Sequence, residues 1–166
     1  NLQTNADNIK GDTNSVETGK TLTLDSGTLA KTVTGSGTLN VNGSVAAKPE
    51  YLSTGTNTVS ASGNLTLADG TLNKEISGNG TLNFNGNVST NANYIKTETN
   101  TVASGKTLTL SSGSLTKSVA NSGTVKFAGA TEMQNAVTGG TLQFDSGNVT
   151  VGNAAHIAGD TNTINS

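Results

Sequence analysis

Apolar side chains recur at every second position over short stretches of the chain. The clearest stretches are Leu-x-Leu pairs, each followed at a constant interval by a similar apolar pair. They occupy residues 22–24, 39–41, 65–67, 82–84, 108–110 and 125–127. An alternation with period two predicts β-strands with one buried face. Because no window shows the 3.6-residue period of an amphipathic helix, we expect an all-β fold.

The apolar pairs belong to a 43-residue repeat. The segment GTLNVNG at 37–43 returns as GTLNFNG at 80–86 and as GTVKFAG at 123–129. The repeat predicts one β-solenoid over residues 1–166, with units at 8–50, 51–93 and 94–155 and the start of a fourth at 156. A further apolar pair, Leu142 and Phe144, follows the pair at 125–127 at the same interval, so we expect an inserted turn in the third unit.

Short strands at this spacing cannot bury their apolar faces alone, and stacking solves that problem. We therefore expect a parallel β-solenoid with two turns per repeat, about 17 to 26 residues per turn, and roughly eight turns. The inward residues should then form one column, made of Leu22, Leu39, Leu65, Leu82, Leu108, Val125 and Leu142. A β-sandwich or barrel also fits short strands with glycine turns, but antiparallel hairpins need strand spacings of about 8 to 12 residues.

Composition narrows the function classes. Leu, Ile, Val and Phe make up only about a fifth of the chain, a share also found in disordered proteins, but the strict apolar spacing and the net charge of −2 favour a folded core. The chain has nine lysines and no arginine, so a nucleic-acid partner is not expected. The longest apolar run is two or three residues, so we expect no membrane insertion by this segment.

Candidate chemistry is sparse. There is one His, no Cys and eleven scattered carboxylates, so we predict no catalytic residue, no cofactor and no metal site, and no enzymatic activity. The Gly-Gly-x-Gly-x-Asp signature of calcium-binding solenoids is absent from the sequence.

Two sets of polar residues are candidates for a role. A recurring Thr-Asn pair is interpreted as a structural ladder, in which Asn takes a left-handed corner and stacks from turn to turn. Its members are Asn14, Asn57, Asn100 and Asn162. The alternative interpretation of this pair is a stripe that faces a ligand. The candidate contact surface combines outward threonines with the inserted turn, and comprises Thr21, Thr23, Thr66, Thr107, Thr109, Glu132 and Gln134.

The segment GTVKFAGATEMQNAVTGGTLQFDSGNVTV at 123–151 and the GSGTLNVNG type of segment resemble the passenger-domain repeats of bacterial autotransporters and related large surface adhesins. The resemblance covers nearly the whole chain. It implies a right-handed parallel β-helix, secretion through the outer membrane to the bacterial cell surface, and a role as adhesin or stalk.

Two functions follow as hypotheses. The first is a structural and adhesive rod segment that contacts a glycan or protein of a host or neighbouring cell, or another rod. The second is a flat-faced module that binds ice or carbohydrate through ranks of outward Thr and Asn. Neither chain end resembles a capping turn, so we expect an excerpt from a longer array whose open ends tend to stack.

Overall fold

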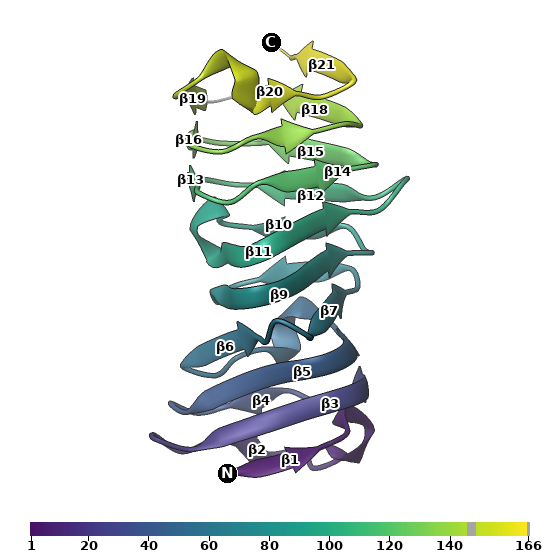
Figure 1. Cartoon of the computed structure of the whole chain (residues 1–166), viewed down its shortest axis with the longest axis vertical. Helices are drawn as coiled ribbons and strands as arrows, with labels where there is room; N and C mark the ends of the chain where they lie inside the picture. The colour runs from purple at the N-terminus through teal and green to yellow at the C-terminus, as the bar shows by residue number, and fades with distance from the viewer. Residues whose placement is uncertain (146–148, 166) are drawn as a thin grey trace.

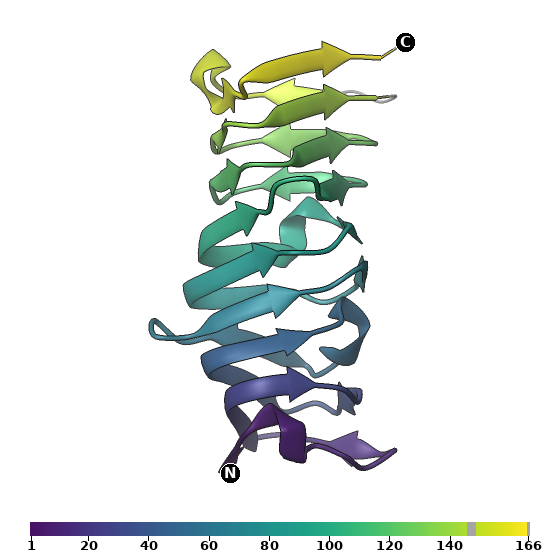
Figure 2. The ribbon, with the colours of Figure 1, turned by 90° about the vertical axis from the view of Figure 1, so that its right-hand side faces the viewer.

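A computed structural model describes residues 1–145 and 149–165 and shows a rod of stacked turns (Figures 1 and 2). There are about nine turns of about 18 residues each. All strand pairs in the described part of the chain are parallel, and the two termini lie at opposite ends of the rod. The predicted parallel β-solenoid is confirmed.

Each turn has three sides. Strands β12 (Thr107–Leu110), β13 (Gly113–Leu115) and β14 (Val119–Asn121) follow one another around one turn, and β15 (Thr124–Phe127) then pairs with β12 again. We call the side that holds β13 face 1, the side that holds β14 face 2, and the side that holds β12 face 3.

The strands are assigned to the faces by their pairing and stacking. Four long strands bend from face 1 to face 2: β3 (Thr21–Leu29), β5 (Thr38–Ala47), β9 (Ile76–Phe84) and β11 (Ile95–Val102). Face 1 adds β1 (Leu2–Thr4), β6 (Thr56–Val59), β13, β16 (Thr131–Met133) and β19 (Val149–Val151). Face 2 adds β7 (Asn64–Leu67), β14, β17 (Val137–Thr138) and β20 (Ile157–Ala158). Face 3 holds β2 (Asn14–Ser15), β4 (Val33–Thr34), β8 (Gly70–Leu72), β10 (Val88–Thr90), β12, β15, β18 (Thr141–Phe144) and β21 (Thr161–Ile164).

One short 3-10 helix ends at the first residue of each repeat unit, which is Asn8, Tyr51, Tyr94 or His156. The four helices are η1 (Ala6–Asn8), η2 (Pro49–Tyr51), η3 (Ala92–Tyr94) and η4 (Ala154–His156). Each is followed directly by an aliphatic residue at the start of the next straight segment, as at Ile95 after η3.

The core is a continuous apolar column inside the three faces. Its largest fully buried side chains include Phe84, Phe127 and Leu24, and the ring of Phe127 stacks on that of Phe144 with centroids 5.0 Å apart. Their outward neighbours on the same strands are polar. Because successive residues of a strand point to opposite sides, this alternation of apolar and polar residues suits a strand with one buried face. The buried apolar side chains from Ala6 to Leu142 thus form one cluster along the rod.

The prediction of two turns per repeat, which required some turns as long as 26 residues, is corrected by the strand pairing. Leu22 pairs with Leu39, as expected for the short turn, but Leu39 then pairs with Asn57 and not with Leu65. Leu65 instead pairs with Val45, on the second half of the long strand β5. The single predicted column is therefore divided among three faces, because every complete turn takes about 18 residues.

The 43-residue repeat is out of phase with the turns. The equivalent residues Leu22, Leu65 and Leu108 lie on faces 1, 2 and 3 respectively. One repeat therefore covers two turns and one further face. From η3 to η4 the chain makes one turn more than in the earlier units, through β15, β16 and β17; residues 146–148 of this unit lie outside the described part.

Candidate interaction surface

The predicted contact threonines do not form one rank. Thr21 and Thr23 lie on face 1, Thr66 lies on face 2, and the pair at 107 and 109 lies on face 3. Because successive repeats are turned by one face, residues that match in sequence point to different sides of the rod. The strand pairing therefore contradicts the expectation that these threonines line up in one rank on the surface.

A different threonine column is present on face 3. Thr107 pairs with Thr124, Thr124 with Thr141, and Thr141 with Thr161. Parallel strands place such neighbours about 4.8 Å apart. The next outward column on the same strands contains Lys126 and Gln143 among its threonines. Face 3 therefore presents one regular hydroxyl column beside one mixed column.

Glu132, one of the two predicted contact residues of the inserted turn, points outward from β16 on face 1. The hydroxyl of Ser114, from the turn before, donates to Oε2 of Glu132 over 2.9 Å. Hydrogen bonds from Gln134 and Ser114 hold the pKa of the Glu132 carboxyl below its ordinary value. The carboxylate and Gln134 thus belong to one small polar group beside a shallow hollow of about 310 Å³, in which Glu132 is the only titratable residue among the described lining residues.

A second polar cluster crosses three turns on face 3. Asp145 follows β18 and forms an ion pair with Lys126 of the turn before. It also accepts hydrogen bonds from Gln143 at 2.8 Å and from Asn165 of the next turn at 2.7 Å. These contacts, with Lys126 the largest cause, lower the pKa of Asp145 to about 2. Every neighbour stabilises the ionised carboxylate, so Asp145 is suited to holding turns together and not to donating a proton.

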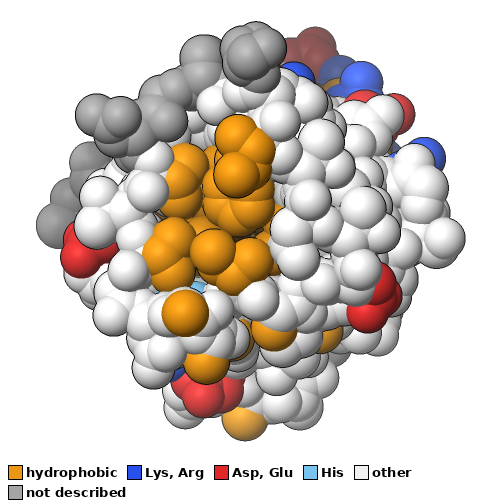
Figure 3. Space-filling model, turned by 90° about the horizontal axis from the view of Figure 1, so that it is seen from above, with side chains coloured by type: hydrophobic (Ala, Val, Ile, Leu, Met, Phe, Trp, Pro, Cys, Tyr) orange, Lys and Arg blue, Asp and Glu red, His pale blue; other side chains and the backbone are white. Residues whose placement is uncertain are grey.

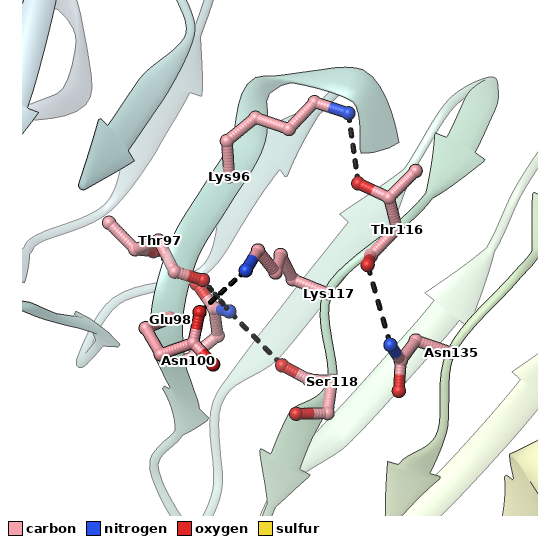
Figure 4. Close-up of polar contacts among 8 residues, drawn as sticks. All are labelled: Lys96, Thr97, Glu98, Asn100, Thr116, Lys117, Ser118 and Asn135. Atoms are coloured by element: carbon pink, nitrogen blue, oxygen red, sulfur yellow. Dashed lines mark hydrogen bonds and ion pairs between the residues drawn. The ribbon is translucent and has the colours of Figure 1, made fainter. Parts of the chain in front are cut away.

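The Asn of the Thr-Asn pair points into the rod. Asn57, Asn100 and Asn162 pair with Leu39, Leu82 and Leu142, which are inward positions, and Asn57 and Asn100 are 4% and 2% exposed. In the interior of a protein an amide must find hydrogen-bond partners. The arrangement around Asn100 shows how it does so (Figure 4).

Asn100 is held by groups of its own turn and of the next. Its Nδ2 donates to the backbone carbonyl of Thr97 at 2.9 Å and to that of Ser118, in the following turn, at 3.0 Å. The hydroxyl of Thr97 donates to Oδ1 of Asn100 at 2.5 Å. Thr54, Asn57 and Glu75 repeat this arrangement one unit earlier. Each pair therefore fastens two turns from inside.

The predicted asparagine ladder is wrong in two respects. Asn14, Asn57 and Asn100 lie on faces 3, 1 and 2, so their side chains do not stack on one another; Asn162 is on face 3 again. No residue other than glycine has a positive φ in the described chain, so the asparagines do not take left-handed corners. Each amide bonds to backbone carbonyls instead.

Sequence reasoning missed a second device that joins turns. A side-chain oxygen from each of the first three 3-10 helices accepts a backbone N–H from the turn above. The pairs are Asp7 with Thr28 at 2.9 Å, Glu50 with Thr71 at 2.7 Å, and Asn93 with Ser114 at 2.9 Å. The residue before each donor is a glycine with positive φ, where a Cβ would collide with the helix's polar side chains. The signal was the 43-residue recurrence of these glycines.

The described residues contain no group of three His, Cys, Asp or Glu side chains placed to hold a metal ion. No helix in the described part of the chain is both long enough and apolar enough to cross a membrane.

Comparisons of the chain with protein-family models, with curated proteins and with solved structures gave no match.

Proposed function

We propose that this chain is a structural and adhesive rod segment of a secreted bacterial cell-surface protein, and that it is not an enzyme. The observation that carries the proposal is the uninterrupted core. Buried apolar side chains follow the rod from Ala6 to Leu142. Four of the seven buried polar residues in the described chain are Asn57 and Asn100 with the threonines three positions before them, Thr54 and Thr97, whose hydroxyls donate to those amides. A fold that places its apolar residues in this way gives length and stiffness.

The outer surface supports the same proposal. Its strands present mainly Thr, Asn, Ser and Lys, spread over three faces, and the two carboxylates with shifted pKa values are held in their ionised form. Functional sites usually interrupt the local pattern of a fold. The polar clusters at Glu132 and Asp145 each offer a single carboxylate, whereas glycoside hydrolysis needs two. The resemblance to autotransporter passenger repeats supports placement at the cell surface.

The second candidate is a binding module for carbohydrate or ice on face 3. The observation that favours it is the column of Thr107, Thr124, Thr141 and Thr161. The mixed column beside it, with Lys126 and Gln143, fits a hydrogen-bonded sugar better than it fits a repeating ice lattice.

The proposal is tested by measuring binding of the purified chain to a printed glycan array and to cultured host cells, beside a polysaccharide-degradation screen and a thermal-hysteresis measurement. We expect binding without cleavage and without hysteresis. Thr124→Lys with Thr141→Lys would abolish binding through face 3, and Thr66→Lys on face 2 is the matched control. Sugar cleavage that is lost in Asp145→Asn or Glu132→Gln would contradict the non-catalytic role, and hysteresis lost in the face 3 variant would favour the ice binder.

A further inference from the structure

An apolar hollow opens on the side of the rod, at the ends of β3, β5 and β7 on face 2. Seen along the axis, apolar side chains gather mostly in the middle of the rod, and polar side chains surround them (Figure 3). The hollow departs from this arrangement. It measures about 320 Å³, close to the lower limit of small-molecule sites, and its lining includes Ala30, Ala46, Ala47, Lys48, Tyr51 and Ala68.

Three alanines of the hollow stand where other repeat units carry polar residues. Ala46 faces outward from β5, and its neighbours in the turns before and after are the outward Thr28 and Thr66. The 43-residue repeat matches Ala30 with Asn73 and Thr116, Ala46 with Ser89 and Glu132, and Ala68 with Asp25 and Ser111. The apolar surface around the half-buried Tyr51 is therefore specific to this part of the rod.

The lysine of the hollow stands where other helices have a capping asparagine. Asn91 and Asn153 precede η3 and η4, and the side chain of each accepts a backbone N–H of its helix. Lys48 precedes η2 and has no acceptor, so this helix lacks a side-chain cap. Lys48 is exposed, and no described residue forms an ion pair with its ammonium group. The position gives up a stabilising contact and places a positive charge beside the hollow.

The charges around the hollow leave this lysine dominant. Lys48 is the only charged residue among the described lining residues. Carboxylates of the surrounding turns each accept a backbone N–H, in the pairs Asp7 with Thr28 at 2.9 Å, Glu50 with Thr71 at 2.7 Å and Asp69 with Asn87 at 2.6 Å. A ligand in the hollow would therefore meet an apolar floor and one ammonium group.

From these observations we propose that the hollow binds the terminal hexuronic acid of a glycan, with the sugar ring against Tyr51 and the alanine methyl groups and the carboxylate on Lys48. One face of a pyranose ring carries C–H groups that pack on apolar side chains. The ammonium and the carboxylate form a charge-assisted hydrogen bond, which fixes the orientation of the ring. The small volume favours a single ring without a long side chain. This site rests on the proposed adhesive role and names its class of glycan.

The test compares glycans that differ only in the carboxylate. The whole chain is applied to an array of oligosaccharides that end in glucuronic or galacturonic acid, beside the same oligosaccharides ending in glucose or galactose. We expect about tenfold tighter binding of the acidic member of a pair, as one charge-assisted hydrogen bond provides. Titration with methyl glucuronide should shift the backbone amide NMR signals of residues 46–48, 50, 51 and 68.

Two variants separate the charge from the hollow. Lys48→Asn introduces the residue of the η3 cap, so it should fold, and it should bind acidic and neutral glycans alike. Ala46→Glu introduces the residue that the third unit has at this place, and it should abolish binding of both because it fills the hollow. The matched controls are Lys74→Asn, at an exposed lysine outside the hollow, and Ser89→Glu, at the equivalent place in the second unit. Both should bind as the wild type does.

The outcomes distinguish this site from the adhesive role. Equal binding of acidic and neutral glycans by the wild type would overturn the site, and so would an absence of binding to any uronic acid. Variants at Lys48 and Ala46 that bind as the wild type does would also overturn it. Binding to neutral glycans or to host cells that both variants retain would leave the adhesive role in place without this site.

Discussion

The Thr-Asn pair occurs in the middle of the rod and at its two ends, and the copies differ in what lies three positions before the Asn. Asn57 and Asn100 follow Thr54 and Thr97, whose hydroxyls donate to the amide oxygen. Asn14 and Asn162 follow Gly11 and Gly159, and their amide nitrogens bond to the carbonyls of those glycines. The first two asparagines are buried, Asn14 is half-buried and Asn162 is exposed.

The difference teaches what burial demands of an amide. An exposed amide oxygen can accept from water, so the oxygen of Asn162 does not need a donor from the protein. Inside the rod the oxygen needs a donor from the protein, since an unsatisfied buried polar group costs about 1–3 kcal/mol. The threonine supplies that donor. The hydrogen bonds of Asn57 and Asn100 should therefore contribute more to the free energy of unfolding than those of Asn162.

The largest expected effect comes from removing an interior amide. Asn100→Ala leaves the carbonyls of Thr97 and Ser118 and the hydroxyl of Thr97 without their partner, so we expect a loss of about 2–3 kcal/mol in the free energy of unfolding. Asn162→Ala should cost about 0.5 kcal/mol or less, because the site is exposed. Urea unfolding of both variants measures the difference, and equal losses would contradict the comparison.

A smaller effect is expected from removing the hydroxyl alone. Thr97→Val keeps the shape of a fully buried side chain but leaves Oδ1 of Asn100 without a donor, so we expect a loss of about 1–2 kcal/mol. The double variant Thr97→Val with Asn100→Leu should lose less stability than the sum of the losses of the single variants Thr97→Val and Asn100→Leu. A double-mutant cycle in urea tests this, and simple additivity would show that the two side chains are not coupled.

The smallest effect concerns pH and separates a half-buried charged contact at Asp145 from the buried neutral contact at Asn100. The pKa of Asp145 is lowered to about 2, mainly by Lys126, so the carboxylate contributes stability above its ordinary pKa. This contribution is lost as the pH falls from about 4 to about 2. Asp145→Asn should therefore show a smaller drop in urea midpoint over this range than the wild type does.

The loss caused by Asn100→Ala should be the same throughout that range, because an amide does not titrate. A wild type and an Asp145→Asn variant with parallel pH profiles would show that the contacts around Asp145 do not support the last turns.

The strands were predictable, and the number of turns per repeat was not. Leu22 and Leu24, or Leu108 and Leu110, alternate with threonines, and that pattern alone places them in half-buried strands. β6, between Leu39 and Leu65, is hard to find in the sequence because one of its two inward residues is Asn57, which hydropathy does not mark as core, and only Val59 is apolar. Without this strand, the step from Leu39 to Leu65 resembles one long turn.

The contacts between turns were predictable only in part. The Thr-Asn recurrence identified Asn57 and Asn100 as structural residues, but their partners, a preceding Thr and a carbonyl of the next turn, depend on the true turn length. The acceptors Asp7, Glu50 and Asn93 share no residue type, only a side-chain oxygen at one place on a 3-10 helix. The 43-residue spacing of these acceptors, and of the glycines they contact, marks the positions in the sequence, but the contact itself depends on the true turn length.

Each repeat ends one face further around the axis than it began, so no single face of the rod carries the same repeat position in consecutive units. A motif carried once per repeat at Leu22, Leu65 and Leu108 winds about the axis like the thread of a screw. A flat receptor layer beside the rod can meet only every third copy of such a motif, whereas a flexible chain that wraps around the rod can meet all of them. Changing the length of the array by one repeat would rotate everything beyond it by a third of a revolution.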